Sequence, residues 1–360
     1  MKQLDGPGMR EGLRIAARGT TPAAFAAVMA TAIVSTAAER YHMHLLSVVL
    51  VALAAVILAL LAVLTAARFA YFPTDVATDW GRPQSAFGFL TFVAGVTVLG
   101  ERLDELGLAA PALFLVGAGI LSWVILSYGV QLRIMLATQK PPVPEAVDGS
   151  WLLWVVATQS LATAAAMIGV HERALVQVAT VVAVCAWAAG TVLYIVIVTI
   201  VMARLLLYSV RARDLEPSYW ISMGATAITV LAGARILNLP HTIPIVNAVA
   251  PNVLGFSFTV WAFGTWMVPF LGAIAIWRHL PPERVPFHYE GGLWSMVFPL
   301  GMYAAASAEF GGVARLPFMV LVGGVAAYVA IAAWAGVAAM WLWFTLQPWL
   351  RRGAIEAAPQ

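Results

Sequence analysis

Ten apolar windows, separated by short polar breaks, run through the sequence between residues 22 and 347. A membrane-spanning helix needs about 20 mostly apolar residues, and a helix satisfies its own backbone polar groups inside a bilayer. The windows therefore predict ten transmembrane helices in an all-α integral membrane protein. The predicted spans cover residues 22–38, 44–67, 84–100, 108–132, 150–170, 174–208, 217–237, 250–278, 292–308 and 316–347.

The composition agrees with a membrane protein and argues against several other classes. Charged residues make up 10% of the chain and hydrophobic residues 62%, with a mean hydropathy of +0.89. A soluble domain carries roughly 25% charged residues. The net charge of +3 is too small to indicate a nucleic-acid partner. The single cysteine, Cys185, cannot form an intrachain disulfide.

The first apolar window has the outline of a cleavable signal peptide, because basic residues precede a short apolar stretch that ends in small residues. The charged lead is long, however, and the stretch matches a helix repeat found further along the chain. We interpret the window as the first transmembrane helix. The chain is then one ten-helix transmembrane domain over residues 22–347, with tails at residues 1–21 and 348–360.

The distribution of lysine and arginine predicts the orientation in the membrane. Fifteen of the 20 basic residues lie on the side that holds both termini. Cytoplasmic loops are enriched in such residues, so we expect both termini to be cytoplasmic in a multi-pass protein of the cell membrane. The five basic residues on the opposite side are Arg40, Arg102, Arg173, Arg235 and Arg315.

The odd-numbered spans repeat at a regular interval. They start near residues 22, 84, 150, 217 and 292, and they end in the related tags "AAER", "LGER", "VHER", "AGAR" and the looser "SAEFGGVAR". Pro22, Pro83 and Pro217 stand at first turns, where a missing backbone N–H costs nothing. We predict five helical hairpins with pseudo-fivefold symmetry.

Small and polar residues follow one face of each odd-numbered span, whereas the even-numbered spans are uniformly apolar. Close helix packing is one explanation, because small residues let membrane helices approach one another. The recurrence of the pattern in five alternating helices favours an inner ring that lines a central pore. The candidate pore-lining residues are Thr31, Ser35, Gly88, Thr91, Gly95, Gln159, Thr163, Ser222, Thr226, Thr229, Ser295 and Gly301.

The ninth span carries Phe298 and Pro299 near its centre. Proline inside a helix removes one backbone donor and displaces the carbonyl four residues back, here that of Ser295. A water-filled lumen can satisfy that carbonyl. Phe298 shares a helical face with Ser295 and Gly301, so it points along the small-residue stripe.

The sequence resembles the tellurite-resistance/dicarboxylate transporter family, which includes the plant slow anion channels and the malate and sulfite permeases of yeasts. The resemblance rests on five pieces in order: "FAAVMATAIVS", "FGFLTFVAGVTVLG", "GSWLLWVVATQSLA", "PSYWISMGATAITVLAG" and "LWSMVFPLG". It extends over residues 22–347. The sequence departs from the family pattern at two places. The first span has alanine where the family often has glycine, and the fifth span, with "WLLWVVA", lacks the proline that is common there.

The resemblance implies odd-numbered helices around a central pore, and a homotrimer with one pore per subunit. It also implies a pore-blocking phenylalanine, which corresponds to Phe298. A bulky apolar ring in a narrow wet passage is a hydrophobic gate, and Pro299 would bend the helix beside it. The alternative is that Phe298 packs between helices.

No ionisable residue falls in the middle of a predicted odd-numbered span. Proton-coupled transporters usually place such a residue within the membrane, so its absence favours channel-like passage of small anions. Candidate anions are C4-dicarboxylates such as malate, sulfite, nitrate, chloride and oxyanions such as tellurite. The alternative is an ion-coupled secondary carrier for an organic acid such as malate.

We expect neither enzyme activity nor a bound cofactor. The six histidines lie in or beside loops, so they predict no haem and no metal site within the bundle. The sequence has no Gly-rich phosphate loop after a strand and no paired catalytic carboxylates. The expected partners are a small anion and membrane lipid.

The five arginines opposite the termini each stand near the end of an odd-numbered span, at the outer mouth of the predicted pore. There they could raise the local anion concentration, or they could simply complement the helix dipole. Acidic residues on the same side outnumber them, which weakens a simple electrostatic funnel. These acids are Glu39, Glu101, Asp104, Glu105, Glu172 and Glu309.

Overall fold

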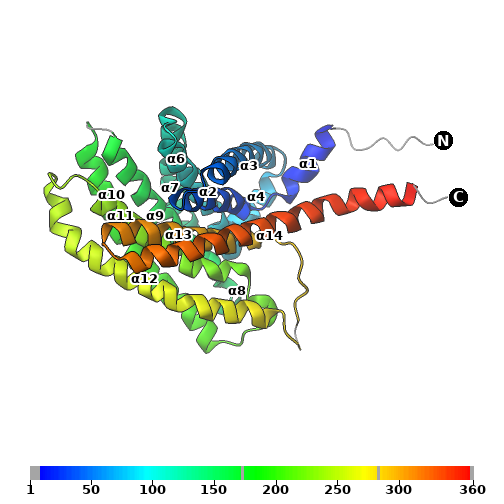
Figure 1. Cartoon of the computed structure of the whole chain (residues 1–360). Coiled ribbons are helices and arrows are strands. Elements are labelled where there is room, and N and C mark those ends of the chain that lie inside the picture. The colour runs from blue at the N-terminus through cyan, green and yellow to red at the C-terminus, as the bar shows by residue number, and fades with distance from the viewer. Residues whose placement is uncertain (1–8, 172–173, 282–283, 357–360) are drawn as a thin grey trace.

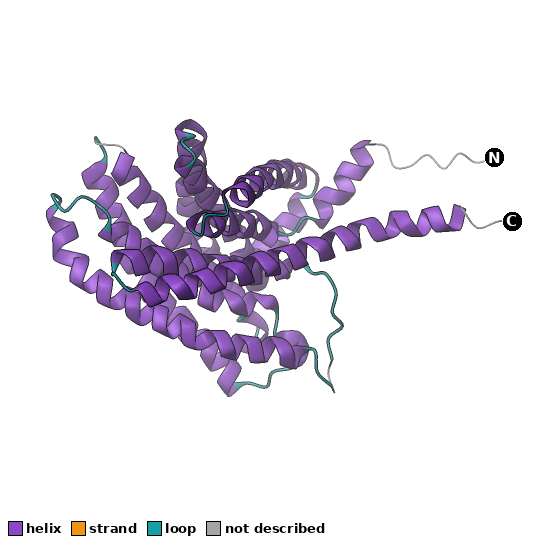
Figure 2. Cartoon of the chain, in the orientation of Figure 1, coloured by secondary structure: helices purple, strands orange, loops and turns teal. Residues whose placement is uncertain are grey.

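The computed structural model describes residues 9–171, 174–281 and 284–356, and every regular element within these ranges is a helix (Figures 1 and 2). The odd-numbered spans form five helices, here called the inner helices. They are α2 (Ala26–Arg40), α6 (Leu90–Glu105), α9 (Leu153–His171), α11 (Ile221–Leu237) and α13 (Trp294–Val313). The even-numbered spans form five longer helices, here called the outer helices. They are α3 (His44–Tyr71), α7 (Ala109–Met135), α10 (Val176–Leu207), α12 (Pro244–Arg278) and α14 (Pro317–Glu356).

The ten helices form five hairpins. Each inner helix packs against the outer helix that follows it in the chain, as α2 does against α3 and α13 against α14. Figure 1 shows the last of these pairs, α13 and α14, running side by side across the front of the molecule. The predicted hairpin repeat is therefore confirmed.

The inner helices close into a ring. In chain order α2 packs against α6, α6 against α9, α9 against α11 and α11 against α13, and α13 then returns to α2. Helices α2 and α13 thus meet, although more than 250 residues lie between them in the chain. This closure makes α2 part of the folded bundle, as the interpretation of the first window as a transmembrane helix requires.

Burial separates the inner from the outer helices. In the four inner spans that begin at Pro22, Pro83, Gly149 and Pro217, between 72% and 83% of the most apolar stretch is buried. The corresponding share is 17–50% in the five outer spans. The apolar faces of the outer helices are therefore left for lipid, while the inner helices are enclosed by protein.

The most apolar stretch of the inner helix α13 is less apolar than that of the other nine long helices. Among the described residues, nine helices are long and apolar enough to span a membrane, and α13 is not one of them. Its 20 residues include Pro299, Glu309 and several small or hydroxyl residues, which lower its hydropathy. Since it packs among α2, α11 and α14, protein rather than lipid surrounds it.

Each inner span starts with a short 3₁₀ segment on the same side of the bundle, here called the start face; the opposite side is the end face. The segments are η1 (Pro22–Phe25), η2 (Phe87–Phe89, after the short helix α5, Pro83–Ala86), η3 (Gly149–Leu152), η5 (Pro217–Trp220) and η6 (Gly291–Leu293). Pro22, Pro83 and Pro217 occupy first turns, as predicted.

Arginines near the ends of outer helices join the hairpins at the start face. Arg204 pairs with Asp214 at 3.4 Å, and Arg278 pairs with Glu290 at 2.7 Å. Arg68 pairs in the same way with Asp79. In each case the acid precedes the next inner span, so the ion pair ties the end of one hairpin to the beginning of the next.

The helices differ from the predicted spans at several places. Helix α12 begins at Pro244 rather than at residue 250, so that Pro251 lies two turns inside the helix. Helix α14 continues to Glu356, through most of the predicted C-terminal tail. The predicted N-terminal tail contains α1 (Met9–Gly19), which packs on α3 and places Arg14 over the ring of Tyr71.

Gly149 marks the closest approach between two inner spans at the start face. A Cβ atom at this position would overlap the backbone of Ser218 and Tyr219, which cannot rotate away as a side chain can. We expect Gly149→Ala to destabilise the protein by about 1–3 kcal/mol, the usual cost of overpacking. The measurement is the melting temperature in detergent. Gly272→Ala is the matched control, because its Cβ would meet nothing within 4 Å. Equal melting temperatures for the two variants would contradict the close approach.

Candidate functional site

Phe298 is fully buried on α13, with no exposed surface. The next residue, Pro299, packs against Gly224 of α11, where a Cβ atom would stand 2.9 Å from the proline Cγ. Because Gly224 has no side chain, the ring of Pro299 can pack directly against α11. Phe298 lies eleven residues before Glu309, and eleven residues are close to three full turns, so both side chains leave α13 on the same side.

The twelve candidate pore-lining residues are all buried. Three of the glycines lie against the first inner span. Gly88 faces Ala23, and a Cβ on Gly95 would stand 3.4 Å from the Phe25 carbonyl oxygen. A Cβ on Gly301 would stand 2.9 Å from Ile33. These glycines bring α6 and α13 close to α2, which is the packing explanation for a stripe of small residues.

Four polar candidates contact outer helices. Gln159 Nε2 donates to the Trp187 carbonyl of α10 at 3.2 Å, and Thr31 Oγ1 accepts from Trp334 Nε1 of α14 at 3.0 Å. Ser35 donates to the Ser47 carbonyl of α3 at 2.7 Å. Thr226 abuts Gly264 of α12, which has no side chain to displace it. For these four residues, too, the contacts correspond to packing between an inner and an outer helix.

The remaining hydroxyl candidates bond to nearby backbone. Thr163, Ser222 and Thr229 each donate to a carbonyl three or four residues earlier in the chain, at 2.7–3.0 Å. Thr91 donates to the Gly88 carbonyl at 2.7 Å. Their oxygens can still accept a hydrogen bond, so these residues remain candidates for the pore lining, together with the buried Ser295.

Ser160 on α9 is a candidate that the sequence analysis missed. Its neighbours point at outer helices, since Gln159 contacts α10 and Thr158 accepts from Trp123 of α7. Residues of a helix are about 100° apart, so Ser160 points away from both outer helices. Its hydroxyl is buried and has no hydrogen-bond partner among the described residues. Buried polar groups rarely stay unpaired, and water in a passage would satisfy this one.

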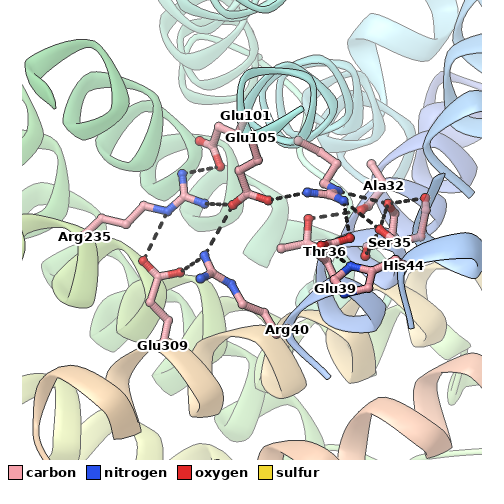
Figure 3. A network of polar contacts seen from close by, with 12 residues as sticks. Ala32, Ser35, Thr36, Glu39, Arg40, His44, Glu101, Glu105, Arg235 and Glu309 are labelled. Carbon is pink, nitrogen blue, oxygen red and sulfur yellow. Dashed lines mark hydrogen bonds and ion pairs between the residues drawn. The ribbon is translucent and has the colours of Figure 1, made fainter. Parts of the chain in front are cut away.

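Three arginines and four glutamates converge at the end face, where α2, α6, α11 and α13 finish (Figure 3). The members of this end-face cluster are Glu39, Arg40, Glu101, Arg102, Glu105, Arg235 and Glu309. Three guanidinium groups face four carboxylates, so the cluster carries a formal charge of −1. Two of the predicted outer-mouth arginines, Arg40 and Arg235, are thus held in ion pairs rather than free.

Arg102, also predicted at the outer mouth, is 98% buried inside the bundle. It donates to the hydroxyls of Ser35 at 3.3 Å and Ser47 at 2.8 Å. It also pairs with Glu39 at 2.7 Å and Glu105 at 2.8 Å. These four partners clamp α2, α3 and α6 together, so Arg102 has a structural role.

Of the other two predicted outer-mouth arginines, only Arg315 is among the described residues. Arg315 follows α13 in the left-handed conformation, with a φ of 56°. Arg173 is outside the described residues. The predicted third span ends at residue 100, before Glu101 and Arg102. Because α6 continues to Glu105, both residues lie inside a helix and are buried.

Acidic residues precede three inner spans at the start face: Asp148, Glu216 and Glu290. Asp148 caps η3 by accepting a hydrogen bond from the Ser150 backbone N–H at 2.7 Å. Burial raises the pKa of Asp148, although its hydrogen bonds from Ser150 act in the opposite direction. The start face therefore holds a carboxyl group that resists ionisation.

Comparison with known proteins identifies relatives of this chain. The sequence profile of the voltage-dependent anion channel family (SLAC1) matches residues 19–342. An uncharacterized membrane protein of Mycobacterium tuberculosis strain H37Rv is 47% identical over 142 residues, which are 39% of this chain and 71% of that protein. An uncharacterized transporter of Methanocaldococcus jannaschii is 28% identical over 121 residues, 34% of this chain and 33% of that protein.

The raised pKa of Asp148 predicts a pH-dependent stability. The native state holds this proton more tightly than the unfolded chain, so ionisation destabilises the native state. An aspartate in an unfolded chain ionises at about pH 4, so we expect the wild-type melting temperature to fall as the pH rises above about 4. We expect it to fall less in Asp148→Asn, since asparagine caps a helix equally well. Glu11→Gln on the exposed side of α1 is the control. Parallel pH profiles for wild type and Asp148→Asn would refute this assignment.

Proposed function

The chain belongs to the voltage-dependent anion channel family, and on that premise we propose that it conducts small anions across the cell membrane through a passage inside the ring of inner helices. The observation that carries this proposal is the closed ring itself, with buried polar groups such as Ser160 directed away from the outer helices. A ring of helices shielded from lipid is the kind of interior in which a membrane protein can hold water and ions.

We propose that the start face is cytoplasmic, because the excess of lysine and arginine lies on that side. The candidate substrates are small anions: C4-dicarboxylates such as malate, sulfite, nitrate, chloride or tellurite-type oxyanions. The homotrimer remains a proposal from the family resemblance. Large exposed apolar side chains on the outer helices, such as Phe114 and Leu321, are suited to lipid or to a neighbouring subunit.

Phe298 is the proposed gate. Three features support this role: complete burial, a position on the same side of α13 as Glu309, and an adjacent proline that fits against Gly224. An apolar ring in a narrow passage blocks ions because it offers no replacement for their hydration shell.

An ion-coupled carrier is the second candidate, and one observation favours it. Glu101 of α6 pairs with Arg235 of α11 at 2.9 Å, so two inner helices share a largely buried ionisable pair. Coupled transporters use such groups as relays. Anion currents in voltage-jump recordings distinguish the candidates, since a channel conducts along the anion gradient without a pH gradient.

We expect Phe298→Ala to raise anion flux severalfold in liposomes, because truncation removes the apolar obstruction. The assay measures influx of malate, sulfite, nitrate and chloride into vesicles without a pH gradient. Phe310→Ala is the matched control, since Phe310 is an equally buried phenylalanine on α13. The gate assignment fails if both variants change flux alike, or if the folded Phe298→Ala protein conducts no faster than wild type.

A further inference from the structure

Four charged residues of the end-face cluster form a closed ring of ion pairs, one residue from each of four inner helices (Figure 3). Arg40 of α2 contacts Glu309 of α13 at 2.9 Å and Glu105 of α6 at 3.3 Å. Arg235 of α11 contacts the same two glutamates at 3.8 and 3.9 Å. We call these four residues the ion-pair ring. It spans the end of the proposed passage.

The side chain of Arg235 points to the inside of the helix ring. Thr226 faces the outer helix α12, and Arg235 comes nine residues later, which is two and a half turns of helix. It therefore leaves α11 on the side opposite α12. Glu309 leaves α13 on the same side as Phe298. The ion-pair ring and the proposed gate thus lie along one passage.

The three ion-pair contacts of Arg235 differ in length. Its Nη1 pairs tightly with Glu101 at 2.9 Å. The Nε and Nη2 atoms face Glu309 and Glu105 at 3.8 and 3.9 Å, distances too long for hydrogen bonds. These two nitrogens form the edge of a guanidinium that binds an oxyanion with two parallel hydrogen bonds. The ion-pair ring therefore leaves the bidentate edge of Arg235 without hydrogen bonds to Glu105 or Glu309.

Glu105 and Glu309 would keep partners if they moved away from Arg235. Glu105 retains Arg102 at 2.8 Å, and Glu309 retains Arg40 at 2.9 Å. Opening the ring at Arg235 would break only the two longest contacts. By contrast, an anion that met the closed ring would face the whole end-face cluster, whose four carboxylates outnumber its three guanidiniums and repel it.

We propose that the Nε and Nη2 edge of Arg235 is an oxyanion-binding site that opens the ion-pair ring. A carboxylate or sulfite group accepts hydrogen bonds from both nitrogens, Glu105 and Glu309 withdraw to Arg102 and Arg40, and the end of the passage opens. Chloride has no two oxygens to bridge the edge, so it binds more weakly. The site rests on the proposed passage of anions and adds to it a preference for oxyanions.

The test measures binding of malate, sulfite and chloride to the purified protein in detergent by titration calorimetry. We expect malate and sulfite to bind at least tenfold more tightly than chloride. Arg235→Lys keeps the charge but loses the bidentate edge, and we expect at least a tenfold loss of malate affinity. Glu309→Gln removes a competing carboxylate, so malate affinity should rise severalfold. Arg278→Lys is the control, because Arg278 is a paired arginine at the start face.

The site is overturned if wild type binds no oxyanion, if chloride binds as tightly as malate, or if Arg235→Lys binds like wild type. Should Arg235→Lys fail to fold, as judged by size-exclusion chromatography, unchanged malate affinity in Glu309→Gln overturns it instead. Chloride flux in liposomes reports separately on the proposed function. Flux without oxyanion binding refutes only the site, and binding without any flux refutes the proposed passage.

Discussion

Contact between polar side chains and lipid is energetically costly, and this constraint decides which helices lie inside the bundle. The inner helices carry buried hydroxyl, amide and charged groups such as Ser160, Gln159 and Arg102. Each outer helix covers its inner partner and presents apolar side chains outward. Leu45, Phe114 and Leu321 on these helices are 72–80% exposed. The hairpin repeat, the closed ring and the protected interior all follow from this division.

The proposed passage would contain two barriers in series. Phe298, the proposed gate, would obstruct its middle with an apolar ring, and the ion-pair ring at the end face would close its end with charges that pair with one another. In this proposal the first barrier excludes ions by withholding hydration, and the second repels anions until one displaces a glutamate. Helix α13 contributes to both, through Phe298 and Glu309. Since α13 is enclosed by α2, α11 and α14, it needs no long apolar stretch for contact with lipid.

Hydropathy and repeat length were sufficient to predict the helices and their pairing, because each hairpin repeats the same alternation of a polar-striped and an apolar helix. They were not sufficient to predict which way the stripes face. Small residues serve both close packing and a pore lining, and the contacts of Gln159 and Thr226 correspond to packing. The ion-pair ring joins residues up to 269 positions apart, so no local pattern could reveal it. The sequence predicted Arg102 at the outer mouth of the pore because the predicted third span ends at residue 100, five residues before the end of α6.

The claim that anions pass inside the ring of inner helices is tested most directly by comparing two buried hydroxyl positions. Ser160 points away from the outer helices, whereas Thr226 faces α12. Each is replaced by cysteine in a Cys185→Ser background, and chloride flux is measured in liposomes before and after a membrane-impermeant anionic thiol reagent. The account predicts that the reagent blocks flux through Ser160→Cys and leaves flux through Thr226→Cys unchanged. Equal block, or no block at either position, would contradict it.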